Sequence, residues 1–149
     1  MKKAVFFVSI IFVLMLITDV STQPSGARRY INLPGHPQLP FSDGVLVGDT
    51  LYLSGRLGLD PKTGTPPEDP EQEIRDILDG MKATLKESGM TMDDLVFVQV
   101  FCTDLSFYEK FNAIYVSYFS KDFPARAFLG TARLLRGCHF EVQGIAVRR

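Results

Sequence analysis

The apolar run VFVQVFC at residues 96–102 constrains the fold more than any other segment. β-branched and aromatic residues dominate the run, and these residue types favour β-strands. Because alternate residues of a strand point to opposite faces, Val98 and Val100 share one face while Phe97 and Phe101 share the other. A strand with one face in water alternates apolar and polar residues instead. The run therefore predicts a strand that is covered on both faces.

A first covering helix is predicted between Asp69 and Gly89. Asp69 is a suitable N-cap, Pro70 fits the first helical position, and Gln72 completes a pattern similar to a capping box. Gly89 ends the helix, because glycine readily adopts the backbone conformation that follows a helix. The residues of the expected buried face recur at helical spacing: Ile74, Ile77, Leu78, Met81 and Leu85.

A second helix is predicted from Ser106 to Ser120. Its apolar stripe, which we interpret as core, consists of Phe107, Phe111, Ile114, Tyr115, Tyr118 and Phe119. The other strands are predicted at 45–47, 51–54, 125–134 and 138–148, the first two joined by a turn at Gly48–Asp49. Residues 28–40 are rich in proline and glycine and predict an irregular segment. The order β-β-α-β-α-β-β indicates an α+β fold with a mixed sheet.

The two helices are expected to lie on the same face of the sheet, because crossover connections share one handedness. The other face is then left uncovered, although the strand at residues 96–102 is apolar on both sides. An exposed apolar face of this extent implies a partner surface, and self-association is the simplest way to cover it. We therefore expect a subunit of a homo-oligomer.

Opposite charges nearly balance, with 16 Lys and Arg against 17 Asp and Glu. A balanced chain has no field that attracts nucleic acid or an anionic membrane, so we expect neither as a partner. The two cysteines, Cys102 and Cys138, and the two histidines, His36 and His139, are scattered without the spacing of a metal site. We expect no metal, no cofactor and two separate buried thiols.

The amino end carries a different pattern. Two lysines precede an apolar stretch from Ala4 to Ile17, which is shorter than the ~20 residues of a membrane span. A charged start followed by a short apolar run is typical of a secretory signal. We expect a signal peptide at residues 1–27 and a mature domain at residues 28–149, exported to the periplasm or secreted without stable membrane association. An uncleaved membrane tether or a cytoplasmic protein is the alternative.

Two charged residues of the closing strands are candidates for chemistry. Arg126 precedes the apolar residues of FPARAFLG, and a guanidinium is rarely buried without a partner. Arg126 therefore reaches solvent, pairs with Asp122, or binds an external anion. Glu141 lies on the polar face of CHFEVQG, where a solvated face is the alternative to a functional role. We expect the closing strands to pair as a hairpin, with Arg126 and Glu141 offset along it and room for a small ligand between them.

Five segments carry a resemblance to a known family: PFSDGVLVGDTLYLSGRLGLDPKTG, VFCTDL, NAIYVSYF, FPARAFLGTARL and EVQGIAVRR. They span residues 40–149, and this part of the chain resembles the RidA family of reactive-intermediate deaminases, also called the YjgF or L-PSP family. The resemblance implies a chorismate-mutase-like fold with both helices on one face of the sheet. It also implies a homotrimer, whose sheets form a central barrel with three ligand clefts between subunits.

The resemblance further implies a hydrolytic deamination that needs no metal or cofactor. In this family the arginine of the PAR motif, matched by Arg126, binds the carboxylate of a 2-imino or 2-enamino acid. The glutamate of the last strand, matched by Glu141, holds or activates the attacking water. The products are a 2-keto acid and ammonia.

Five other positions are expected to line the ligand cleft by the same resemblance: Phe41, Ser54, Arg56, Asn112 and Phe128. Three of them depart from the family pattern. Phe41 stands where many members have tyrosine, Arg56 where glutamine is usual, and Phe128 where a small residue or cysteine is common. These departures leave a non-catalytic trimer that binds small carboxylates as the alternative function, with endoribonuclease activity, reported for some relatives, as a third.

Overall fold

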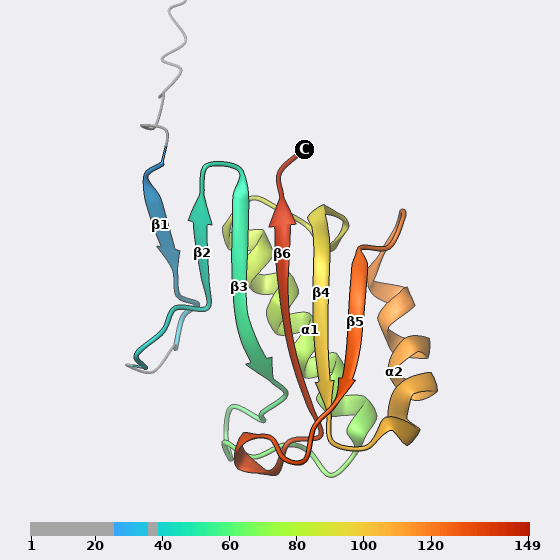
Figure 1. Cartoon of the computed structure of the whole chain (residues 1–149). Helices are drawn as coiled ribbons and strands as arrows, with labels where there is room; N and C mark the ends of the chain where they lie inside the picture. Colours follow the sequence, from blue (N-terminus) through green and yellow to red (C-terminus); the bar gives the residue numbers. More distant parts are fainter. Residues whose placement is uncertain (1–25, 36–38) are drawn as a thin grey trace, which may run out of the picture.

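The computed structural model describes residues 26–35 and 39–149, so residues 1–25 of the predicted signal peptide lie outside the described part. Its elements are β1 (Arg28–Ile31), β2 (Gly44–Val47), β3 (Thr50–Leu57), α1 (Pro70–Glu87), β4 (Leu95–Cys102), α2 (Tyr108–Tyr115), β5 (Ala125–Gly130) and β6 (Phe140–Val147). The six strands form one sheet in the order β1-β2-β3-β6-β4-β5, in which only β4 and β5 run parallel. Both helices lie against one face of this sheet (Figure 1). The predicted α+β architecture is confirmed.

Helix α1 follows the sequence pattern closely. Asp69 caps it by accepting a hydrogen bond from the Glu71 N–H at 3.0 Å, and Pro70 is its first residue. Gly89 follows the helix with a φ of +72°, a conformation that favours glycine. The capping-box role of Gln72 is wrong, because its side chain instead donates to Asp76 at 2.7 Å, one turn along the helix.

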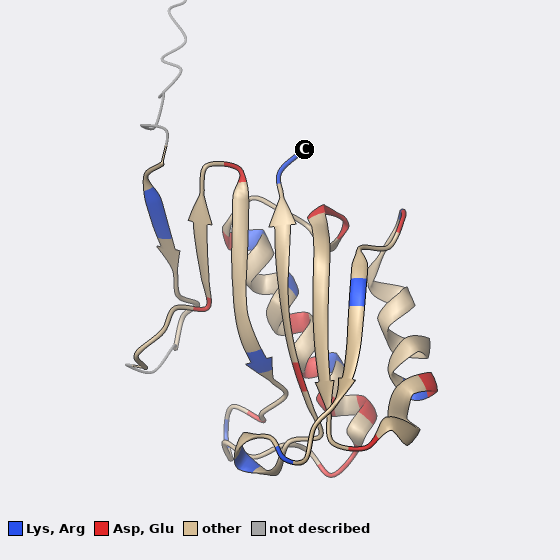
Figure 2. Cartoon of the chain, viewed as in Figure 1, with Lys and Arg blue, Asp and Glu red and all other residues tan. Residues whose placement is uncertain are grey.

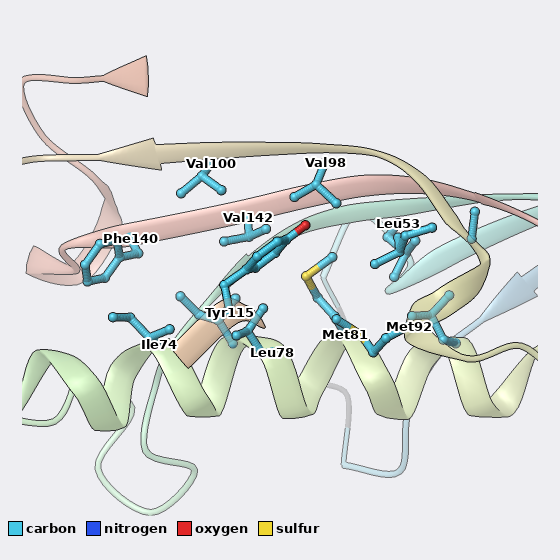
Figure 3. Close-up of a cluster of buried hydrophobic side chains, with 14 of the residues drawn as sticks. Leu53, Ile74, Leu78, Met81, Met92, Val98, Val100, Tyr115, Phe140 and Val142 are labelled. Carbon is cyan, nitrogen blue, oxygen red and sulfur yellow. The ribbon is translucent and has the colours of Figure 1, made fainter. Parts of the chain in front are cut away.

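The core lies between α1, α2 and the helix-facing side of the sheet (Figure 3). The predicted stripe of α1 is completely buried there, together with Val98, Val100 and Cys102 of β4 and with Phe111 of α2. Helix α2 is shorter than predicted, and single 3₁₀ turns flank it at Leu105–Phe107 and Val116–Tyr118. Both cysteines are free and buried, as expected.

The opposite side of the sheet, which we call the open face, has no helix over it (Figure 1). An apolar row crosses the open face in register from strand to strand: Tyr30, Val45, Tyr52, Ile145, Phe97 and Ala125. Tyr30, Tyr52 and Phe97 of this row are exposed in the single chain. The two-sided apolar character of β4 therefore reflects a real exposed surface. Neither helix of the described residues has the length and apolar character needed to span a membrane.

Strand β1 was not expected from the sequence. Its four residues include Arg28 and Arg29, so the segment lacks the alternation of apolar and polar residues that predicts a strand. It forms because β2 offers an unpaired edge, with Tyr30 opposite Val45 and Ile31 opposite Gly44. Ile31 alone of the four is buried.

The expected hairpin of the two closing strands is wrong. Strand β5 pairs with β4, with Arg126 opposite Val98, whereas β6 lies on the other side of β4, with Glu141 opposite Phe101. The connection from β5 to β6, residues 131–139, is longer than a tight hairpin loop and contains a 3₁₀ turn. The strongly apolar β4 takes the interior position, where it is paired on both edges.

Candidate functional site

Charged residues are scarce in the sheet (Figure 2). Outside β1, the strands carry only Arg56, Arg126 and Glu141. A charge in a sheet that packs on one side and exposes an apolar face on the other is costly unless it is paired or functional. These three residues are therefore the candidates in the strands for a role other than packing.

Arg126 is half-buried on the helix-facing side of β5, at the edge of the sheet. Its Nη2 donates a hydrogen bond of 2.6 Å to Oδ1 of Asn112 on α2. Its Cζ lies 4.7 Å from the centroid of the Tyr115 ring. Three further aromatic rings have centroids within 5.9 Å of the same carbon: Tyr108, Phe111 and Phe128. The guanidinium thus sits among aromatic rings, which attract a cation and keep water from it.

No described carboxylate forms an ion pair with Arg126, and the predicted alternative partner Asp122 does not contact it in this way. A guanidinium has five N–H donors, and one of them binds Asn112. Arg126 opens onto a cleft of about 470 Å³, whose other lining residues are Asn112, Tyr115, Val116, Phe123 and Pro124. Donors facing an apolar cleft without an internal anion make a site for an external carboxylate.

Phe128 has a supporting role beside the guanidinium. Its ring packs edge-on against Tyr108 at 5.1 Å and against Phe111 at 5.4 Å. Together with Asn112, it therefore belongs to the same cluster as Arg126, which we call the β5 cluster. The structure brings these three sequence-predicted residues together.

Glu141 lies on the open face, because its register partner Phe101 is three residues from Val98, the partner of Arg126. An odd separation along β4 places the two partners on opposite faces. The Glu141 carboxylate lies against Gly55 of β3, and no described residue forms a hydrogen bond or ion pair with it. One chain by itself therefore does not bring Arg126 and Glu141 together.

Phe41 and Ser54 lie on the same side of the sheet as Glu141. Both line an open cleft of about 770 Å³, which Tyr30 and Val45 of the apolar row also border. The Ser54 hydroxyl donates to the Ser42 carbonyl at 2.6 Å, which ties β3 to the segment that carries Phe41. Glu141 lies against Gly55, the chain neighbour of Ser54, and we call Phe41, Ser54 and Glu141 the open-face cluster.

Arg56 lines neither of these two clefts. The register of β3 shifts between Leu53 and Arg56, and this irregularity turns Arg56 toward the helices. Its guanidinium pairs with Asp43 at 2.8 Å and lies over Gly80 of α1. Burial lowers the pKa of Arg56 below its ordinary value, and Asp43 partly offsets that effect. Within one chain Arg56 thus forms an ion pair with Asp43, and its expected contribution to the cleft between subunits stays a prediction.

Among the described residues, no three histidines, cysteines or acidic groups gather as metal ligands. The buried thiols are poor nucleophiles, because burial raises the pKa of Cys138 to about 11 and also raises that of Cys102. The chemistry available to this chain therefore centres on Arg126 and Glu141.

Sequence reasoning missed the role of Tyr115, which it assigned to the core alone. Tyr115 has 3% of its surface exposed, and its ring centroid lies 4.7 Å from Cζ of Arg126. The spacing of Asn112 and Tyr115 was the available signal, because residues three apart share one face of a helix. Figure 3 shows the hydroxyl pointing toward the strand layer near Val98, and no described group forms a hydrogen bond with it. Burial raises the pKa of Tyr115 to about 12.

We expect Tyr115→Phe to stabilise the fold. The ring under Arg126 is retained, while an unpaired hydroxyl that costs about 1 kcal/mol or more is removed. Thermal unfolding of the two proteins should show a higher Tm for the variant. The native protein should also lose stability above pH 10, where Tyr115 ionises only in the unfolded chain, and this part of the alkaline loss should vanish in Tyr115→Phe. A lower Tm for the variant would mean that the hydroxyl has a partner, such as an ordered water.

Comparisons with known proteins identify the family to which the chain is similar. The family described as Endoribonuclease L-PSP matches residues 33–148. A RutC family protein of Saccharolobus solfataricus is 39% identical over 109 residues, which cover 72% of this chain and 86% of the relative. The 2-iminobutanoate/2-iminopropanoate deaminase of Escherichia coli K12 is 36% identical over 113 residues, covering 74% and 88%.

A solved structure shares the fold. A protein of unknown function from the conserved Rid family of Yersinia pestis superposes with a TM-score of 0.76 at 31% identity, covering 82% of this chain and all of that protein. Sequence and fold therefore point the same way, and the chain belongs to the endoribonuclease L-PSP family, which includes the RidA deaminases.

Proposed function

We propose that this protein hydrolyses 2-imino and 2-enamino acids to 2-keto acids and ammonia. The observation that carries the proposal is the Arg126 guanidinium, which faces an apolar cleft and has no internal carboxylate among the described residues. Its planar fork of N–H donors matches the two oxygens of a substrate carboxylate. The names of relatives such as the E. coli deaminase support this substrate class.

In the proposed reaction, Glu141 accepts a proton from a water molecule that attacks the imine carbon. The C=N bond becomes a C–N single bond, and the nitrogen takes up the proton from Glu141 to give a tetrahedral carbinolamine. As this intermediate collapses, Glu141 transfers the hydroxyl proton to the nitrogen, the C=O bond forms, the C–N bond breaks and ammonia leaves, so that Glu141 returns to its carboxylate form. Arg126 holds the carboxylate throughout, so that the reacting carbon stays in place near the water.

We further propose that the site is completed by a second copy of the chain in a homotrimer. Support comes from the positions of the two residues on opposite faces and from the exposed apolar row on the open face. A copy that lays its β5 cluster beside the open-face cluster of its neighbour joins one Arg126 to the other chain's Glu141. The same contact covers Tyr52 and Phe97.

Mixing two inactive variants tests this shared site. Arg126→Ala and Glu141→Gln subunits, refolded together in equal amounts, should recover about a quarter of the native activity, because half the copies supply each intact residue at a given cleft. Each variant alone should stay inactive. If the mixture is no more active than its parts while native mass spectrometry confirms mixed trimers, the two residues do not meet across subunits.

The activity itself is tested on the purified domain. 2-Iminobutanoate is generated in the assay by an amino acid oxidase, and formation of 2-ketobutanoate is compared with the buffer rate. A rate no higher than buffer, combined with tight binding of 2-ketobutanoate, would support the second candidate, a carboxylate-binding protein. Phe41 favours that candidate, because it brings no hydroxyl to the cleft that it lines. RNA cleavage that depends on Arg126 would instead support the third candidate function, endoribonuclease activity.

Export is a separate proposal, which rests on the sequence of residues 1–27. We expect the amino-terminal sequence of the protein isolated from its cells to begin after the apolar stretch. A start at Met1 in the soluble fraction would contradict it.

A further inference from the structure

We propose that Gly55 is a positioning residue, whose missing side chain provides the seat for the Glu141 carboxylate. This inference rests on the proposed role of Glu141 as the base. A Cβ built on Gly55 would lie 2.1 Å from Oε1 of Glu141 and 3.1 Å from its Cδ. Any residue with a side chain at position 55 therefore occupies the place that the carboxylate now fills.

The local backbone explains how this seat arises. Gly55 lies at the irregular part of β3, between Leu53, which pairs with Gly144, and Arg56, which pairs with Val142. Glu141 pairs with Leu57, so its side chain extends diagonally back across β3 to reach Gly55. The carboxylate therefore lies beside Gly55, whose chain neighbour Ser54 lines the cleft of about 770 Å³.

The glycine is not needed for backbone conformation. Gly55 is absent from the glycines with positive φ, so its backbone is accessible to alanine. The atoms that alanine would meet are those at the end of a flexible side chain. Alanine should therefore displace the carboxylate while leaving the fold intact. This separation of effects makes the proposal testable.

We expect Gly55→Ala to lower kcat by tenfold to about a hundredfold, because moving a catalytic group by about 1 Å has effects of this size. KM should change less than twofold, because the proposed carboxylate site at Arg126 is untouched. The Tm should stay within about 3 °C of the native value, since the surface change is small. The matched control is Gly130→Ala on β5, where a Cβ meets only Leu105 at 3.4 Å or more and kcat should be unchanged.

A double variant separates positioning from other roles of Gly55. Because Glu141→Gln already removes the base, Gly55→Ala in that background should lower kcat no further. An additional loss of the same factor would overturn the inference, because Gly55 would then act independently of Glu141. Retention of native kcat in Gly55→Ala, alongside a large loss in Glu141→Gln, would overturn it as well.

A spectroscopic measurement tests the contact without activity. In protein labelled with ¹³C at the glutamate Cδ, the resonance that disappears in Glu141→Gln belongs to Glu141. This resonance should shift in Gly55→Ala and stay in place in Gly130→Ala. An unshifted resonance in Gly55→Ala would contradict the contact between Gly55 and the Glu141 carboxylate. If the resonance shifts but the Glu141→Gln variant remains fully active, only the proposed function is contradicted.

Discussion

Replacing Arg126 with alanine is expected to lower kcat/KM for 2-iminobutanoate at least about a hundredfold, because a substrate-positioning contact of this kind contributes several kcal/mol. The variant loses the fork of donors that holds the carboxylate. No other described arginine or lysine lines the same cleft and could replace it. Steady-state kinetics with the imine generated in the assay provides the measurement.

Two further variants make the result specific. Arg126→Lys keeps the charge but not the planar fork, so an intermediate loss is expected. Arg75→Ala removes an exposed arginine of α1 whose nearest carboxylate partner, Glu71, is 3.9 Å away, and it should retain native kinetics. Equal rates for Arg126→Ala and the native protein would remove the basis of the deaminase proposal.

The largest effect on stability is expected from Glu73→Ala. Glu73 lies on α1 with 0% of its surface exposed. Its Oε1 accepts hydrogen bonds from the N–H groups of His139 and Phe140 at 2.8 and 2.9 Å, and its Oε2 is 2.8 Å from His139 Nδ1. It thereby connects α1 to the start of β6. Removal should lower the free energy of unfolding by about 3–5 kcal/mol, because it leaves buried donors without an acceptor.

Denaturant unfolding of matched variants measures this effect. Glu73→Gln keeps one acceptor oxygen and should lose less than Glu73→Ala. Glu71→Ala, two residues earlier and only half-buried, removes surface ion pairs with Arg75 and Lys110 and should change stability by less than about 0.5 kcal/mol. A loss below about 1 kcal/mol in Glu73→Ala would show that the backbone donors find other acceptors.

The sequence predicted those parts of the fold that depend on local patterns. The face and ends of α1 follow from its apolar spacing, Asp69 and Gly89, and the β2–β3 hairpin follows from its two-residue turn. The pairing of β5 with β4 could not be predicted in this way. Residues 131–139 are long enough either to close a hairpin between β5 and β6 or to pass the end of β4 and place the two strands on its opposite sides. Which strands pair with the apolar β4 decides between the two arrangements, and that pairing depends on contacts between distant residues.

For the candidate site too, the sequence indicates which residues to consider but not where they lie. Arg126 and Glu141 could be chosen as candidates from the sequence, Arg126 as a charge before apolar residues and Glu141 as the acidic residue of the last strand that matches the family. Their placement on opposite faces depends on strand order, which the sequence did not reveal. The sequence also did not reveal the irregularity in β3 that sets the side of the sheet on which Arg56 lies. The unpaired hydroxyl of Tyr115 likewise appears only in three dimensions.

The position of β6 has a consequence for biogenesis. Because β6 lies between β3 and β4, the strands that precede it cannot join into one sheet until residues 140–147 have left the ribosome. Until then β3 and β4 both carry bare edges, which are prone to pair with other chains. A nonsense mutation shortly before codon 140 should therefore yield two disconnected strand groups and aggregated product, whereas loss of Arg148 and Arg149 alone should leave the sheet complete.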